Sequence, residues 1–289
     1  MLKYNMLNIP LTKSIENQIE FDIIELNDLL KLASWKDLES PHRLDFNLIM
    51  IVIEGEGIQN IDFKSYEYSK GTIFFVKSHQ ALSFKMNANL KCFFLEFTDN
   101  FLNKLIKNNI HNIFDYMKYP VNMQLSDSHF NDVINNINLL IEQLKIPVDD
   151  FKELILQSLL QSLLLQLTRN RILESLPLNN KEQKLYSDFI HLVHNSHTYT
   201  DQVNDYSKKL NISVRTLSNI LYKYTNKSTK VYLDEFLLLE IKRYLLDDTL
   251  TLQEISNNLN FDEPTNLVKF FKRLEKQTPI KFKKRVRQI

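Results

Sequence analysis

The sequence predicts an α+β protein of two domains, in which short strands and two long helices build the N-terminal half and the C-terminal half is entirely helical. Three observations lead to this fold class. Short apolar runs bounded by turn residues fill residues 46–97. Apolar residues then recur at helical spacing over residues 126–171. Finally, one helical pattern occurs twice, about 50 residues apart, between residues 203 and 285.

Length and composition agree with this fold class. At 289 residues, the chain is long enough for two domains that each bury a core. With 44% apolar and 25% charged residues, its composition is that of a soluble globular protein. The net charge of +1 is unevenly placed, since residues 181–289 hold 19 Lys and Arg against 13 Asp and Glu. A basic C-terminal half suits a nucleic-acid partner, although this excess alone does not distinguish such a partner from chance.

Three features bear on the cellular compartment. The single cysteine, Cys92, has no partner for an intrachain disulfide, which fits a reducing compartment. The first 18 residues lack the continuous apolar core of a signal peptide. The longest apolar run, Leu48–Ile53, is far shorter than the roughly 20 residues that span a bilayer. We therefore expect a cytoplasmic protein without a membrane partner.

The strand region opens with a buried strand over residues 47–53, and Gly55 and Gly57 mark the turn that follows. Gly71 marks the turn before an aromatic strand. Further elements are expected over residues 19–32, 58–63, 66–68, 72–76, 82–84 and 91–97. Strands of this length and spacing predict a small sandwich or barrel.

Two helices are expected next, over residues 126–144 and 151–171. The first has apolar residues three and four positions apart, as an amphipathic helix does. The second is apolar around most of its girth, so it must be covered on more than one side. Core packing and a seam between two copies of the chain both remain open. The candidates for a seam are Leu156, Leu160, Leu163 and Leu167.

Pro177 and Asn179-Asn180 mark Leu176–Glu182 as the expected interdomain linker. This linker places the two domains at residues 1–175 and 183–289.

The most specific pattern lies near the end of the chain. Thr251 and Glu254 are placed as the two halves of a capping box that opens a helix. Asn260 ends that helix, because Asn tolerates a positive φ, and Phe261 is an expected core anchor. A second helix opens at Pro264. Its inward residues are Leu267, Phe270 or Phe271, and Leu274, and its outward residues include Lys269, Lys272 and Arg273. Two helices around a tight turn, the second with a basic outer face, form a helix-turn-helix.

The same pattern occurs once before, with an offset of 49 residues that becomes 50 after the turn. The matched pairs are Val203 with Leu252, Tyr206 with Ile255, Ser207 with Ser256, Leu210 with Leu259, Asn211 with Asn260, Ile212 with Phe261, Leu217 with Leu267, Leu221 with Phe271, Lys223 with Arg273, and Ser228-Thr229 with Thr278-Pro279. A consistent offset predicts two similar units. A helix over residues 231–246 is expected to join them rigidly, with both reading helices on one side of the domain.

These residues resemble the DNA-binding domain of the bacterial AraC/XylS-type transcriptional regulators. In this sequence the places of the family's second-unit pattern hold Asn260-Phe261, Asp262-Glu263-Pro264, Leu267, Lys269, Phe271-Lys272, Lys276, Thr278-Pro279 and Phe282-Lys283. Asn260 and Lys276 stand where the family has glycine, and Leu267 stands in place of an aromatic residue. Asn226 takes the glycine place of the first unit. Asn suits a left-handed turn better than Lys276 does.

The strand region is similar to the cupin-like sensor domain that many of these regulators carry, on the places of Gly55, Gly57 and Gly71. The resemblance implies an N-terminal cupin-like β-barrel with dimerisation helices, followed by an all-α double helix-turn-helix. It implies a sequence-specific DNA-binding transcriptional regulator that responds to a ligand through its N-terminal domain. The implied partners are double-stranded DNA, a small-molecule effector and a second copy of the chain, held through residues 126–171. RNA polymerase is a further candidate partner.

The first unit offers the richer set of candidate base contacts. Ser213 is expected to cap the reading helix. The inward residues are Val214, Leu217, Ile220, Leu221 and Tyr224, and the outward residues are Arg215, Ser218, Asn219 and Tyr222. Arg215 has the donors to pair bidentately with guanine, and Asn219 can pair with adenine. The family's pattern puts base contact at Arg215, Ser218 and Asn219, and phosphate contact at Thr216. Lys223 is a further expected phosphate contact.

In the second unit, the matching base contacts are Thr265, Val268 and Lys269, and Lys272 lies nearer the DNA backbone. Because Pro264 and Val268 make no side-chain hydrogen bond, this unit is expected to read fewer bases, although Val268 can contact a thymine methyl group. Lys281 and Lys283 belong to a basic tail that is expected to bind phosphates.

Metal and catalytic sites are not expected, and no cofactor is implied. Among the metal candidates, His42 and His79 are expected to be surface residues, because Leu44 and Leu82 occupy the places of partner ligands. His191, His194 and His197 drift around a helix at spacing three and have no fourth ligand nearby. No nucleophile elbow or phosphate-cradling loop is present. Two alternatives remain open: a DNA-binding regulator without a ligand, and a cupin-type enzyme with an appended nucleic-acid module.

Overall fold

The computed structural model describes residues 8–9, 19–32, 38–39, 41–78, 80–85, 87, 89–104, 120–172, 180–196, 199–247 and 249–286. The chain divides into two compact units, one within residues 7–177 and the other within residues 178–289. Each unit has its own architecture and its own core.

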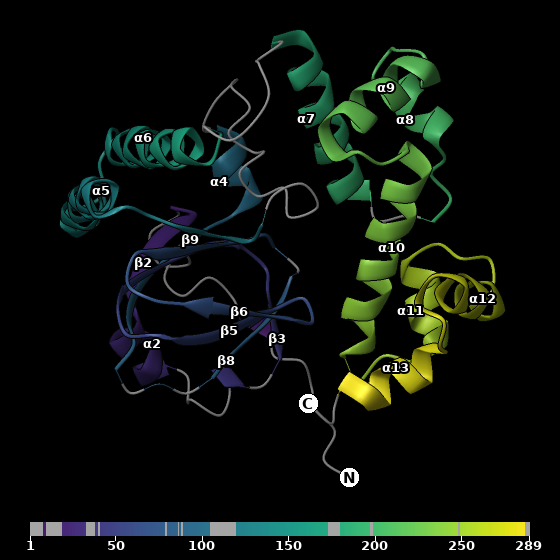
Figure 1. Ribbon diagram of the computed structural model, residues 1–289. Helices are drawn as coiled ribbons and strands as arrows, with labels where there is room; N and C mark the ends of the chain where they lie inside the picture. Colours follow the sequence, from purple (N-terminus) through teal and green to yellow (C-terminus); the bar gives the residue numbers. More distant parts are fainter. Residues whose placement is uncertain are drawn as a thin grey trace. The chain divides into compact units, whose positions relative to one another are not determined.

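The described strands of the first unit form two five-stranded sheets (Figure 1). The first sheet contains, in order, β1 (Asn8–Ile9), β3 (His42–Leu44), β8 (Ala81–Phe84), β5 (Gly57–Ile61) and β6 (Lys64–Tyr68). The second contains, in order, β10 (Asn122–Gln124), β7 (Thr72–Val76), β4 (Asn47–Glu54), β9 (Lys91–Phe97) and β2 (Phe21–Glu25). The pairing is antiparallel throughout these sheets, apart from the parallel pair β1–β3.

The expected barrel is not closed. Between the strands that the structure describes, no ladder joins an edge of one sheet to an edge of the other. The chain instead changes sheets between β4 and β5, through a turn at Gly55 with a φ of +95°. A Cβ atom at Gly55 would lie 2.8 Å from the carbonyl oxygen of Asn89, so glycine is required at this corner. The strands therefore form a sandwich, one of the two architectures that their spacing had left open.

The second sheet is the middle layer of this unit and is buried on both faces. Leu48, Met50 and Val52 of β4 pack with residues of the first sheet. Ile49 and Ile51, which alternate with them, pack with residues of two long helices on the other face. Two-sided burial explains why β4 reads as a continuous apolar run instead of an alternating one.

The two long helices are α5 (Asp127–Lys145) and α6 (Lys152–Ile172), close to the ranges that periodicity predicted. α6 packs against α5 and the second sheet, and the four leucines that were candidates for a dimer seam are completely buried in the core of the first unit. These are Leu156, Leu160, Leu163 and Leu167, all 0% exposed. Their assignment to a dimer seam was therefore wrong. At the corner between the helices, the buried ammonium of Lys152 donates hydrogen bonds to the carbonyl oxygens of Leu144 and Ile146, at the negative end of α5.

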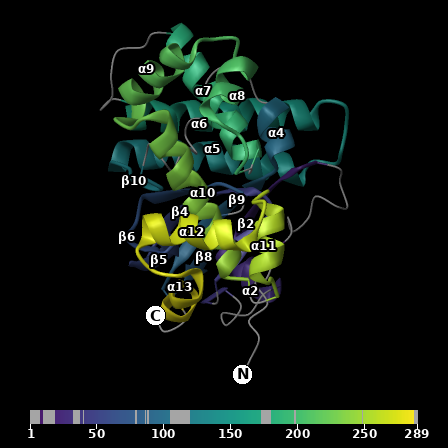
Figure 2. The ribbon, with the colours of Figure 1, turned by 90° about the vertical axis from the view of Figure 1, so that its right-hand side faces the viewer.

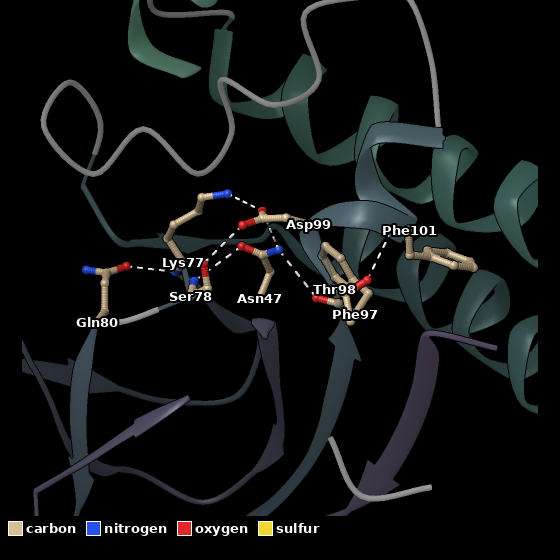
Figure 3. A network of polar contacts seen from close by, with 8 residues as sticks. All are labelled: Asn47, Lys77, Ser78, Gln80, Phe97, Thr98, Asp99 and Phe101. Atoms are coloured by element: carbon tan, nitrogen blue, oxygen red, sulfur yellow. Dashed lines mark hydrogen bonds and ion pairs between the residues drawn. The ribbon is translucent and has the colours of Figure 1, made fainter. Parts of the chain in front are cut away.

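Two short helices complete the described part of this unit, α2 (Leu26–Leu32) and α4 (Asp99–Lys104). Asp99, at the start of α4, is the centre of a polar network (Figure 3). Its carboxylate accepts hydrogen bonds from the Asn47 amide at 3.0 Å and the Ser78 hydroxyl at 3.2 Å, and pairs with Lys77. Burial alone would raise the pKa of Asp99, but the Lys77 ammonium and these hydrogen bonds hold it at about 2.

The second unit is helical throughout its described residues (Figure 2). Its helices are α7 (Asn180–Ser196), α8 (Val203–Lys209), α9 (Val214–Thr225), α10 (Thr229–Leu245), α11 (Leu252–Asn258), α12 (Pro264–Glu275) and α13 (Pro279–Val286). The linker expected over residues 176–182 was too long, because α7 already begins at Asn180; residues 176–179 lie outside the described residues. The basic tail around Lys281 is not a tail either, since it forms the amphipathic helix α13.

The internal repeat is visible in the backbone. Asn211 and Asn260 end α8 and α11 with φ angles of 52° and 54°. Asn226 and Lys276 end α9 and α12 with φ angles of 56° and 60°. Lys276 thus adopts the left-handed conformation despite being a poorer residue for it. The two helix-turn-helix pairs, α8–α9 and α11–α12, are therefore joined through α10, as predicted.

Aromatic side chains hold the helices of the first pair. Tyr186 of α7 stacks on Tyr224 of α9, with 4.7 Å between ring centroids. Phe189 of α7 meets Tyr206 of α8 edge-to-face at 5.4 Å and lies 5.9 Å from Tyr232 of α10. α7 therefore belongs to the same core as the first helix-turn-helix.

Candidate nucleic-acid interface

The first reading helix, α9, begins at a side-chain cap. The hydroxyl of Ser213 accepts a hydrogen bond from the Thr216 N–H at 3.0 Å, as the sequence predicted. Leu217 is 1% exposed and anchors the helix, whereas Arg215 and Asn219 are exposed one turn apart. These two side chains have the reach and the donors for bidentate contacts with base edges.

Two details of α9 differ from the expected pattern. Val214, at the first position of α9, was expected to point inward but is 41% exposed. Ser218 lies on the expected outer face but is only half-buried, and its hydroxyl accepts a hydrogen bond from Thr229 of α10 at 3.4 Å. Arg215 and Asn219 therefore offer more freely available groups than Ser218.

The second reading helix, α12, has Pro264 in its first position and lacks a side-chain cap from Glu263. Thr265, Lys269 and Lys272 are exposed along it, and Val268 is half-buried. The buried face consists of Leu267, Phe270 and Phe271. The outer face therefore carries positive charge, but it has fewer groups that discriminate between bases than α9 has.

One basic residue near the end of each reading helix has an acidic partner within the unit. Lys223 of α9 pairs with Glu182 of α7 at 2.5 Å. Its equivalent in the repeat, Arg273 of α12, pairs with Asp234 of α10 at 2.9 Å. The hydrogen bond to Glu182 raises the pKa of Lys223. To contact a phosphate, the Lys223 ammonium must either leave Glu182 or bind Glu182 and the phosphate together.

The cations of α13 are also unequal. Lys281 is exposed, whereas Lys283 is half-buried and donates a hydrogen bond to the carbonyl oxygen of Asp247 at 2.8 Å. Burial lowers the pKa of Lys283. Arg285 lies 3.4 Å from Glu275. Lys281 is therefore the better placed of the two predicted phosphate contacts.

The histidines do not gather into a site in the part of the chain that the structure describes. His42 is 1% exposed on β3 and stacks near Phe84, so its expected place on the surface was wrong. His194 of α7 stacks on Phe236 at 5.1 Å. His79 and His197 lie outside the described residues. Within those that are described, no three His, Cys, Asp or Glu side chains are grouped as metal ligands.

Two family models match the chain. A model of the AraC-like ligand binding domain matches residues 33–164, which lie in the first unit. A model of a helix-turn-helix domain matches residues 206–285, which include both reading helices. The chain belongs to the AraC family of transcription regulators. This AraC-family regulator binds DNA through its helical unit, and its N-terminal unit is a ligand-binding domain of the family.

The chain is also similar to individual proteins. The Msm operon regulatory protein of Streptococcus mutans is 25% identical over 251 residues, which cover 85% of this AraC-family chain and 87% of that protein. ToxT from Vibrio cholerae, a solved structure, gives a TM-score of 0.44 at 11% identity, over 92% of this chain and 97% of that chain. The AraC-like transcriptional activator CuxR gives 0.31 at 13% identity, over 76% and 73%. No described helix of the regulator is long and apolar enough to span a membrane.

Proposed function

We propose that this regulator reads specific DNA sequences chiefly through α9. The observation that carries the proposal is the pair Arg215 and Asn219, exposed one turn apart on a helix that is capped and anchored behind them. Arg215 contacts guanine and Asn219 contacts adenine in the major groove. Ser218 adds a weaker contact to a base edge, and Thr216 binds a phosphate beside them.

The second unit contributes affinity more than discrimination. Thr265 and Lys269 contact bases, and Val268 packs against a thymine methyl group. The phosphate contacts of this half are Lys272 of α12 and Lys281 of α13, with Lys283 nearby. Lys223 binds a phosphate at the end of α9 once it releases Glu182.

The experiment that tests this function is the selection of bound duplexes from a random DNA pool by the full chain. We expect an enriched motif with a strongly defined half-site for α9 and a weaker one for α12, separated by about one turn of DNA, roughly 10.5 base pairs. A bound pool that remains as random as the input would contradict sequence-specific binding.

We further propose that the inner faces of the two sheets receive the effector. Buried polar side chains lie among the apolar ones there. Gln59, 0% exposed, donates a hydrogen bond to the Ser83 carbonyl oxygen at 3.0 Å, while its own side-chain oxygen meets no hydrogen-bond partner among the described residues. A few polar groups in an apolar surround are typical of small-molecule sites.

A thermal-shift screen of small molecules against the full chain tests the proposal. Finding no stabilising compound would favour the second candidate function, a DNA-binding regulator without a ligand.

The remaining assignments concern assembly and location. We propose a homodimer through residues 126–171, but on the exposed surface of α5, α6 and their connection instead of the buried leucines. The large apolar residues exposed there are Leu139, Ile146, Val148, Phe151, Leu154, Ile155 and Leu165. An exposed apolar patch of this extent is typical of an interface. Sedimentation of the full chain measures the assembly state.

The proposed role is regulatory and cytoplasmic, with RNA polymerase as a further partner and without enzymatic activity. Family membership supports this role. The test of that partnership is the amount of RNA polymerase retained on a promoter fragment that carries the selected motif. The amount retained in the presence of the regulator is compared with the amount retained by the fragment without it.

A further inference from the structure

The two helix-turn-helix pairs are covalently joined by α10 and the short connection to α11. Ion pairs from α10 reach the second pair, since Asp234 pairs with Arg273 of α12 and Lys242 pairs with Glu275 at the end of α12. A domain that must place α9 and α12 in the DNA together gains rigidity from a contact that does not pass through α10. The structure contains such a contact, made by the segment that precedes α8.

That contact is made by Tyr199, in the segment that leads into α8 of the first pair. Its N–H donates a hydrogen bond to the carbonyl oxygen of Leu259 at 2.9 Å. Leu259 is the C-terminal cap residue of α11, where helix carbonyls lack intrahelical partners. The first pair therefore satisfies a backbone group of the second.

The ring of Tyr199 makes the contact specific. It stacks on Phe261 with 4.0 Å between centroids and an interplanar angle of 18°. It also meets Phe270 edge-to-face at 5.8 Å. Phe261 lies in the turn of the second pair, and Phe270 lies on the buried side of α12. One side chain thus touches both the turn and the reading helix of the other pair.

We infer that Tyr199 is a positioning residue for DNA recognition, which fixes α12 relative to α9 and so sets the separation of half-sites that the domain accepts. The inference rests on the proposed function in one respect, namely that both reading helices engage DNA. Tyr199 itself is 38% exposed, so shortening it leaves no large buried cavity. The fold should therefore survive its removal.

The first test measures the coupling without DNA. Lys208 of α8 and Gln253 of α11 are exposed, and the only native cysteine, Cys92, is buried. Spin labels on Lys208→Cys and Gln253→Cys in the full chain report the distance between the two pairs. We expect a narrow distribution for the native sequence and for Tyr199→Phe, which keeps the ring, and a broadened one for Tyr199→Ala.

Tyr224→Ala is the matched control, because it removes a stacked pair that lies wholly within the first helix-turn-helix and α7. It should leave the distribution narrow. An unchanged width for Tyr199→Ala, or equal broadening for both alanine variants, would overturn the inference.

The second test uses DNA. Duplexes carry the selected half-sites at their best separation, or one base pair closer or farther apart. We expect Tyr199→Ala to reduce the preference for the best separation by about tenfold, and Tyr199→Phe to restore it. An equal loss of affinity at every separation would show a merely structural role. Failure of the native chain to bind any duplex would count against the proposed function, while the spin-label distances would still decide the coupling.

Discussion

Val214 and Leu217 are close together on α9 and yet have opposite environments, at 41% and 1% exposed. We expect Val214→Ala to change the free energy of unfolding by no more than about 0.5 kcal/mol, as at an ordinary surface position. Leu217→Ala removes a core anchor and should cost about 2–5 kcal/mol. Urea unfolding followed by far-ultraviolet circular dichroism measures both. Similar losses for the two variants would contradict the orientation of α9.

Lys281 is exposed and Lys283 is half-buried, so their alanine variants should have different effects on DNA binding and on stability. Lys281→Ala should reduce the salt dependence of DNA binding by about 0.9 in log–log slope, with unchanged stability. Lys283→Ala removes the hydrogen bond to Asp247 and should lower the free energy of unfolding by about 0.5–1.5 kcal/mol. Binding titrations at several salt concentrations, together with urea unfolding, separate the two effects. A larger change in salt slope for Lys283→Ala would reverse this assignment.

Asp99 gives the N-terminal unit an acid-sensitive contact. Its pKa falls from 3.8 to about 2 on folding, so the carboxylate stabilises the folded state above about pH 4, and this stabilisation is lost as the pH falls toward 2. Solvent screens part of the interaction, because the Asp99 side chain is 40% exposed. We expect Asp99→Asn to lower the urea midpoint near pH 7 and to lower it less near about pH 3. A difference that grows as the pH falls would contradict this sign.

At the scale of elements, local chemistry was predictable. Thr251 and Glu254 form the capping box, with the Thr251 N–H donating to Glu254 at 2.7 Å. The backbone and side-chain hydrogen bonds from Thr251 lower the pKa of Glu254. The left-handed turns at Asn211 and Asn260 were also predictable, because each depends on one residue and its immediate neighbours.

Features that depend on distant partners were not predictable. The sequence shows that α6 has apolar residues around most of its circumference. Only the packed structure shows that the second sheet and α5 cover its leucines. The inward orientation expected for Val214 was wrong for the same reason, since its exposure depends on neighbouring helices. Tyr199 carried no local signal at all, because its partner Phe261 lies 62 positions later in the chain and only the fold brings them together.

The exposed surface of α5, α6 and their connection is the proposed dimer interface. Burying a leucine-sized side chain stabilises an interface by about 2 kcal/mol. Phe151→Glu combined with Leu154→Glu should therefore convert the proposed dimer to a monomer, because both residues are exposed on the single chain, at 66% and 58%. Sedimentation velocity gives the assembly state, and circular dichroism checks the fold. A folded protein that remains dimeric would place the interface elsewhere.

The uneven charge of the whole chain matches the different roles of its two units. The basic excess falls within residues 181–289, where both reading helices lie. The fold class and the family could be predicted from the repeat and its motif, because a consistent offset between matching residues can be found in the sequence alone. Whether the sheets close into a barrel could not be predicted, because strand spacing alone fits a sandwich as well as a barrel.

We propose that α9 reads bases through Arg215. The most direct measurement is competition binding of the full chain to the selected duplex and to a scrambled one, for the native sequence and Arg215→Ala. We expect Arg215→Ala to lose about 1–3 kcal/mol of binding free energy on the selected duplex, to change little on the scrambled one, and to relax the preference at a single base pair. Equal losses on both duplexes would show that Arg215 holds the DNA backbone and would contradict the claim.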